Sequence, residues 1–235
     1  MASAEALFAS GRLEEAIAQL SDALRSQPTD RAPRTFLFEL LSFAGEYERA
    51  DRQLAALAAD SPTVEAAVAT YRAALQAERV REHMFDTGDL PAPHAPPAVR
   101  GSLDGVAFTS ITDGDDRLGP RLEVIAGGRY LWIPFAHLAS IVVQPPTRLR
   151  DLRWLTARIT TNTTIKDLEL GEVLLPALTP ACWRSPDMEL RLGRATDWSE
   201  QADGAYRPEG QKVLRIDDRD VPLVDVRTLV LSAPS

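Results

Sequence analysis

Apolar residues in the first third of the chain recur at the spacing of amphipathic helices. Leu13, Ile17 and Leu20 follow one another at steps of four and three residues, the period that places side chains on one face of a helix. The same pattern predicts five helices before residue 87. They are expected at about residues 2–9, 13–26, 32–44, 47–59 and 62–85.

The predicted helices form a repeat in pairs. Five small, apolar or proline positions recur 34 residues further along the chain. The first set is Gly11, Ala16, Leu20, Ala23 and Pro28, and the second is Gly45, Ala50, Leu54, Leu57 and Pro62. This period is typical of tetratricopeptide units, in which two antiparallel helices bury an apolar face against a neighbouring pair. The sequence therefore predicts two such units and a protein-binding role for them.

The repeat does not continue beyond the fifth predicted helix. A third unit would need small residues near positions 79 and 84, but the chain has Arg79 and Met84 there. Ser61 offers a side-chain oxygen as N-cap, and Pro62 suits the first helical position. We therefore expect the fifth helix to cap the stack.

A proline-rich stretch, residues 87–101, separates two kinds of pattern. Proline at this density is typical of a stiff, extended connector. After it the apolar period changes from that of helices to that of strands. These features predict a helical domain at residues 1–86, a linker at 87–101 and a β-rich domain at 102–235.

The second region is predicted to be mainly antiparallel β, which makes the fold class α+β. Residues 122–135 contain two apolar runs around Gly127 and Gly128, and residues 212–226 contain two around Asp217–Asp220, both typical of hairpins. Further strand candidates are residues 105–111, 139–143, 158–161 and 189–192. Short helices are expected near residues 135–138 or 149–155.

Composition limits the classes of partner and compartment. The formal net charge is −8, whereas nucleic-acid binding needs a clustered basic face. The apolar runs are too short to cross a bilayer, and residues after Met1 lack the pattern of a signal peptide. The single cysteine, Cys182, cannot form an internal disulfide. We expect a cytoplasmic protein that binds neither nucleic acid nor membrane.

Catalytic motifs are not evident in the sequence. His83, His94 and His137 fall in separate segments, whereas a metal site needs ligands at close spacing. The acidic turn Asp113–Asp116 lacks the alternating oxygen ligands of a calcium loop and is predicted to be a solvated hairpin tip. We therefore expect no enzyme activity, cofactor or metal.

A candidate binding surface follows from the usual repeat geometry, in which the first helix of each pair and the cap form the inner face. That face would expose Glu5, Phe8, Thr35, Glu39, Ser42, Ala69, Ala73 and Gln76. It is partly apolar and partly acidic, so it suits an amphipathic helix whose basic residues approach Glu5 and Glu39. Phe38 stands where such units normally have a small residue, so the helices are expected to cross at a wider distance there.

Four longer segments point to a family. They are TFLFELLSFAGEYERADRQL (residues 35–54), LRDLRWL (149–155), GEVLLPAL (171–178) and RLGRATDW (191–198). In this order they resemble the ImpE/TagJ family of type VI secretion accessory proteins. The resemblance implies a non-enzymatic cytosolic adaptor that binds a helix of the small contractile-sheath subunit and, by that route, is linked to the AAA+ ATPase that recycles the sheath. It brings no catalytic residues.

Two alternatives stay open from the residues alone. One is a general tetratricopeptide scaffold with another protein partner. The other is a small-ligand-binding or enzymatic β domain that uses its tryptophans together with Asp197 or the Asp113 turn.

Overall fold

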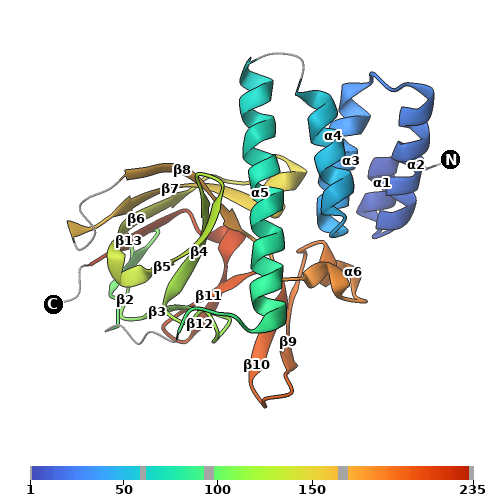
Figure 1. Cartoon of the computed structure of the whole chain (residues 1–235). Helices are drawn as coiled ribbons and strands as arrows, with labels where there is room; N and C mark the ends of the chain where they lie inside the picture. The colour runs from blue at the N-terminus through green and yellow to red at the C-terminus, as the bar shows by residue number, and fades with distance from the viewer. Residues whose placement is uncertain (1, 59–61, 93–97, 164–168, 233–235) are drawn as a thin grey trace.

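A computed structural model describes residues 2–58, 62–92, 98–163 and 169–232. Stacked helices form one half of the molecule and β-sheets form the other, with the long helix α5 (Pro62–Thr87) between them (Figure 1). No helix in these described ranges is long and apolar enough to span a membrane. The α+β class predicted from the sequence is confirmed.

The five helices follow the predicted order. The first four are α1 (Ala4–Ala9), α2 (Leu13–Ser26), α3 (Arg31–Phe43) and α4 (Tyr47–Leu57). Two of them begin at a side-chain cap, because Ser3 accepts a hydrogen bond from the Ala6 N–H at 3.2 Å and Asp30 accepts one from the Ala32 N–H at 3.3 Å. Ser61, the predicted cap of α5, lies outside the described residues.

The turns inside the two helical pairs are equivalent. Gly11 has a φ of +77° and Gly45 a φ of +72°, a left-handed conformation that glycine adopts without strain. The residue directly before α2 and the residue directly before α4 also make the same hydrogen bond. The Arg12 N–H donates to the Leu7 carbonyl and the Glu46 N–H to the Leu41 carbonyl, both at 2.9 Å. The 34-residue repeat is therefore a structural repeat.

An eight-stranded antiparallel sheet forms the body of the second half, in the order β2-β1-β13-β6-β7-β8-β4-β5. Its strands are β1 (Gly101–Leu103), β2 (Val106–Phe108), β4 (Arg121–Ala126), β5 (Arg129–Pro134), β6 (Leu138–Val143), β7 (Trp154–Thr161), β8 (Glu169–Pro176) and β13 (Thr228–Leu231). Smaller sheets contain β3 (Ile111–Asp113), β11 (Val213–Ile216) and β12 (Arg219–Pro222), and β9 (Thr196–Glu200) with β10 (Tyr206–Gly210).

Both predicted hairpins are present, as β4–β5 and β11–β12. The candidate strand at residues 105–111 is divided between β2 and β3, which belong to different sheets. The predicted strand at residues 189–192 is wrong, because Met188–Arg191 form the short helix α6. A helix begins here because the Asp187 side chain caps its N-terminus by accepting a hydrogen bond from the Glu189 N–H at 2.8 Å.

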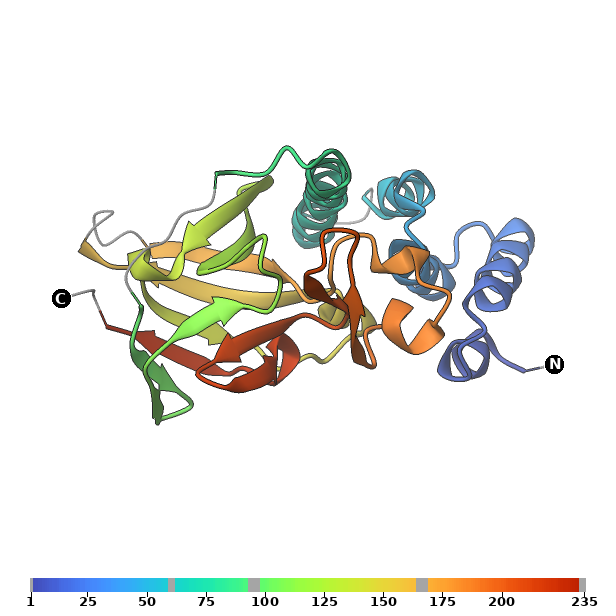
Figure 2. The same cartoon turned by 90° about the horizontal axis from the view of Figure 1, so that it is seen from below.

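Single turns of 3-10 helix occupy the connections. They are η1 (Phe135–His137), η2 (Leu149–Leu152), η4 (Cys182–Arg184) and η5 (Leu223–Asp225). The first two lie where short helices were expected. The segment around α6 reaches the helical pairs in both views (Figures 1 and 2).

One hydrophobic core continues from the helices into the sheet. The buried Trp154 stacks on Phe38 with ring centroids 6.4 Å apart, and Tyr71 packs on the same indole at 6.0 Å. Ile125 and Leu174 also join this cluster. The separation into residues 1–86, 87–101 and 102–235 therefore stays a prediction about chain organisation, while the packing unites the two halves.

Candidate protein-binding surface

The inner face of the helices is largely covered by the chain's own second half. Trp154 fills the space beside Phe38. At the other end, Arg194 lies 5.3 Å from the Phe8 ring centroid and donates to the Phe8 carbonyl at 2.9 Å. Part of the surface predicted to hold a partner is therefore an intramolecular interface.

The eight predicted binding residues fall into three groups by exposure. Glu5, Ala69 and Gln76 are exposed, Phe8, Thr35 and Ala73 are half-buried, and Glu39 and Ser42 are buried. The expectation that all eight are accessible is wrong for the last two. Ser42 donates to the Phe38 carbonyl at 2.9 Å within α3, and Glu39 is covered by η2. A role of the eight residues in binding stays a prediction.

Glu39 does not present a free carboxylate. Arg150 of η2 donates to its Oε1 at 2.7 Å. Burial raises the pKa of Glu39, and the Arg150 contact offsets only part of that rise. An incoming basic residue would therefore meet a carboxylate that is already neutralised by a cation of the same chain.

An open groove of about 680 Å³ remains where the inner face is not covered. It lies between α3, the end of α4, the first half of α5 and η2. Its lining residues are Arg31, Thr35, Phe38, Glu39, Leu54, Leu57, Thr63, Val64, Ala67, Val68, Tyr71, Arg148, Leu149 and Arg150. We call it the α3–α5 groove. It contains Thr35 and Glu39 of the predicted surface and has a mainly apolar floor.

A second hollow of about 330 Å³ lies next to the groove. The two share Tyr71, Arg148 and Arg150. The second hollow extends to Gln144 and Thr156, at the ends of the adjacent strands β6 and β7. Together they form a surface that both halves of the molecule build.

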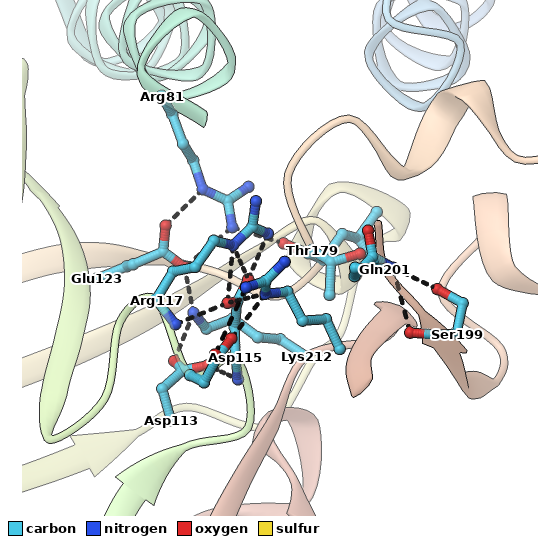
Figure 3. Close-up of polar contacts among 12 residues, drawn as sticks. Arg81, Asp113, Asp115, Arg117, Glu123, Thr179, Ser199, Gln201 and Lys212 are labelled. Carbon is cyan, nitrogen blue, oxygen red and sulfur yellow. Dashed lines mark hydrogen bonds and ion pairs between the residues drawn. The ribbon is translucent and has the colours of Figure 1, made fainter. Parts of the chain in front are cut away.

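A buried cluster of charges joins α5 to the sheets (Figure 3). Arg81 makes a two-pronged contact with Glu123, at 2.6 and 2.9 Å, and also donates to the Leu178 carbonyl at 2.9 Å. Lys212 forms ion pairs with Glu123 and, at 2.6 Å, with Asp113. These four side chains are almost fully buried. They come from α5, β3, β4 and the residue before β11.

The predicted solvated tip at Asp113–Asp116 is partly wrong. Asp113 and Asp115 are buried, whereas Asp116 is exposed. The cause is cationic neighbours, because Asp113 pairs with Lys212 and Asp115 with Arg117 at 2.6 Å. A carboxylate enters a protein interior only when such partners replace water.

The cluster extends along α5 on both sides of Arg81, which also lies 3.3 Å from Glu78. Glu78 accepts from the Trp154 indole at 3.0 Å, and Arg153 lies 3.6 Å from the same carboxylate. One turn later, Glu82 accepts from the Trp183 indole at 2.9 Å and from Tyr47. Glu78, Arg81 and Glu82 therefore fix α5 against the sheet, against η4 and against α4.

Comparison with known proteins identifies the family. A model of the ImpE protein family matches residues 105–230, and a tetratricopeptide-repeat model matches residues 7–78. Over 260 aligned residues the chain is 33% identical to the type VI secretion system accessory component TagJ of Pseudomonas aeruginosa, covering 96% of this chain and 90% of TagJ. The chain belongs to the ImpE/TagJ family.

A crystal structure has the same fold. Protein VPA1032 from Vibrio parahaemolyticus superposes with a TM-score of 0.82 at 22% identity, and the match covers 97% of each chain. The arrangement of tetratricopeptide-like helices against an antiparallel sheet is therefore shared with that protein.

The single cysteine of this ImpE/TagJ chain, Cys182, is buried. Burial raises the pKa of Cys182 to about 11, so its thiol is a poor nucleophile at neutral pH. Within the described ranges, no three His, Cys, Asp or Glu side chains are grouped to hold a metal ion.

The buried cluster predicts a pH effect on stability. Burial raises the pKa of Asp113 from 3.8 to about 6, and the pairing with Lys212 offsets part of the shift. At pH values between these two pKa values, Asp113 is protonated in the folded chain but ionised in the unfolded chain. The contribution of Asp113 to stability therefore increases as the pH falls.

When the pH falls from 7 to 5, we expect the free energy of unfolding of the wild-type chain to increase by about 1 kcal/mol relative to that of Asp113→Asn. Urea unfolding of both proteins at the two pH values measures this difference, because carboxylates common to both cancel. A difference that does not change with pH would contradict the assignment.

Proposed function

We propose that the chain is a non-enzymatic adaptor of a type VI secretion system. In this proposal it works in the cytoplasm and its α3–α5 groove receives a helix of the small contractile-sheath subunit. The bound subunit then links the chain to the AAA+ ATPase that recycles the sheath. The single observation that carries the proposal is the similarity to TagJ, an accessory component of such a system, along 96% of the chain.

The groove is the part of the helical repeat best suited to a partner. Tetratricopeptide pairs bind helices and peptides through apolar concave surfaces. Elsewhere on that surface, Trp154 packs on Phe38 and Arg194 on Phe8, so the chain itself occupies those positions. The floor formed by Leu54, Leu57 and Val68 lies within the open groove.

The non-enzymatic part of the proposal is supported by the contacts of the buried titratable groups. Arg81 and Lys212 both form ion pairs with Glu123. Their charges are used in holding α5 to the sheets.

A binding experiment with a matched pair of variants tests the proposal. Ala66 and Ala67 are both exposed neighbours on α5, but only Ala67 lines the groove. We expect the wild-type chain and Ala66→Trp to retain the purified small sheath subunit in a pull-down. We expect Ala67→Trp to weaken binding at least about tenfold, because the indole fills space needed by the partner.

The outcomes separate the parts of the proposal. If the wild-type chain does not bind the sheath subunit, the adaptor function is wrong. If both variants bind equally well, the partner uses another surface. Adding the ATPase tests the last part, since it should be retained only when the sheath subunit is present.

A further inference from the structure

The outer face of the eight-stranded sheet exposes valines over β13 and β6. On these strands Leu229, Ile141 and Val143 are buried in the core, whereas Val230 and Val142 on the opposite face are 49% and 40% exposed. Figure 1 shows the helical half beside the β8–β4–β5 end of the sheet, away from β13 and β2. An antiparallel sheet with one buried face normally has polar side chains on the other, so these neighbouring valines mark an unusual surface.

A row of short, uncharged side chains crosses this face. The register of the strands places its five members side by side on β2, β1, β13, β6 and β7, and each is exposed or half-buried. They are Ala107, Ser102, Val230, Ser140 and Thr160. The row is about 19 Å wide, four spacings between strands. Because it has no long side chain, the sheet is flat here, and two flat faces can stack as the sheets of a β-sandwich do.

The charges around the row cancel, whereas the whole chain has a formal net charge of −8. Arg158 on β7 and Glu172 on β8 are cross-strand neighbours on one side of β13. On the other side, Asp104 lies in the β1–β2 turn and Arg100 precedes β1. All four are exposed. An acidic chain repels its own copies, so a contact between two copies favours a face on which the charges balance.

We propose that this surface, which we call the β13 face, pairs with the same face of a second copy of the chain. The β13 face consists of the row together with Thr228 and Val142. The two-fold axis is parallel to β13, so β13 lies over β13, β6 over β1 and β7 over β2. Val230 then faces the partner's Val230. Arg158 comes next to the β1–β2 turn of the other copy, which contains the partner's Asp104, and this contact of opposite charges occurs twice.

The size of the β13 face predicts a weak dimer. Two rows of residues on five strands cover an area at the small end of specific interfaces. We expect reversible dimerisation with a dissociation constant on the order of 10–100 µM. None of the residues of the β13 face lines the α3–α5 groove, so the inference is independent of the proposed function.

Sedimentation equilibrium of the full-length protein tests the pairing with two matched variants. Val230→Lys places two ammonium groups against each other at the axis, so it should weaken the dimer at least about tenfold. The control is Val106→Lys. Val106 is 60% exposed but lies on the opposite face of the sheet, where it pairs with Leu103. That variant should leave the dissociation constant unchanged.

A change of charge tests the direction of the axis. Arg158→Glu should weaken dimerisation about three- to tenfold, because each new carboxylate approaches the partner's Asp104. Addition of Asp104→Asn should restore part of the affinity. The asparagine can still accept the hydrogen bond that Asp104 accepts from the Thr228 N–H at 2.7 Å.

The results that would overturn the inference are distinct. A wild-type chain that stays monomeric at about 200 µM would show that the β13 face does not bind a second copy. A dimer that Val230→Lys does not weaken, or that Val106→Lys weakens equally, would place the contact elsewhere. A dimer that Arg158→Glu leaves unchanged would contradict the two-fold axis parallel to β13. Binding of the sheath subunit tests the proposed function separately.

Discussion

Glu123→Ala is expected to lower the free energy of unfolding by about 3–5 kcal/mol, because removal of one member of a buried ion cluster leaves its partners uncompensated. Glu123 receives both prongs of Arg81 and the ammonium of Lys212. Burial opposes its negative charge, but these two cations outweigh burial and hold the pKa of Glu123 well below its usual range. Without this carboxylate, Arg81 would keep Glu78 and Lys212 would keep Asp113, but the carboxylate shared by the two buried cations would be gone.

Urea unfolding, followed by circular dichroism, measures the loss. The control is Glu15→Ala, since Glu15 is an exposed carboxylate that pairs with Arg12 at the surface. We expect no measurable change for that variant. A loss at Glu123 no larger than the loss at Glu15 would show that the cluster does not fasten α5 to the sheet.

Periodicity predicted the parts of the fold in which each element buries its own stripe. Helix α2 has the expected bounds because Leu13, Ile17 and Leu20 face inward at the helical period. The β4–β5 hairpin follows from the two glycines between apolar runs. Patterns of this kind involve residues that are close together in the sequence, so they can be recognised in a single sequence.

The covering of the inner helical face could not be predicted in this way. It depends on contacts between distant residues, such as Arg150 with Glu39 and Trp154 with Phe38. The large Phe38 was the available signal. It stands where a small residue is usual because it packs against the sheet's indole and leaves less of the surface for a separate chain.

The buried charges were also missed, because ionisable residues on a helix normally face water. Glu78, Arg81 and Glu82 have the spacing of a solvated face, yet all three are buried. A weak signal existed in Lys212, which directly precedes the apolar run of β11. Its partners, Asp113 and Glu123, are about 90 or more residues away and become visible only in the fold.

The interface between the helical half and the β-rich half is buried, so the adaptor model needs both halves. Trp154, Arg81 and Lys212 are all buried there, so a chain cut in the proline-rich segment would expose apolar surface and unpaired charge on both pieces. The α3–α5 groove also uses residues of both halves, including Tyr71 and Arg148. The proposed binding therefore requires the intact chain.

The two repeat glycines offer a matched test of how the halves are joined. Both have positive φ, so alanine at either position costs about 1–2 kcal/mol in backbone strain. Their surroundings differ. A Cβ at Gly11 would lie 3.6 Å from the Cβ of Met188, an ordinary contact, whereas one at Gly45 would lie within 3 Å of the Trp183 indole.

We therefore expect Gly45→Ala to destabilise the chain by about 3–4 kcal/mol, since overpacking adds to the backbone strain. Displacement of Trp183 would also break its hydrogen bond to Glu82, which is 2.9 Å long. Urea unfolding gives the free energies, and tryptophan fluorescence should shift to the red for Gly45→Ala but not for Gly11→Ala.

A double-variant comparison isolates the clash from the strain. In a Trp183→Ala background the indole is absent, so the cost of Gly45→Ala should fall to that of Gly11→Ala in the wild-type chain. If that cost does not fall in the background without Trp183, the close approach of η4 to the second helical pair is not what makes Gly45 necessary. If the cost does fall, Gly45, which marks the repeat in the sequence, is also needed to let Trp183 of the second half pack against the second helical pair.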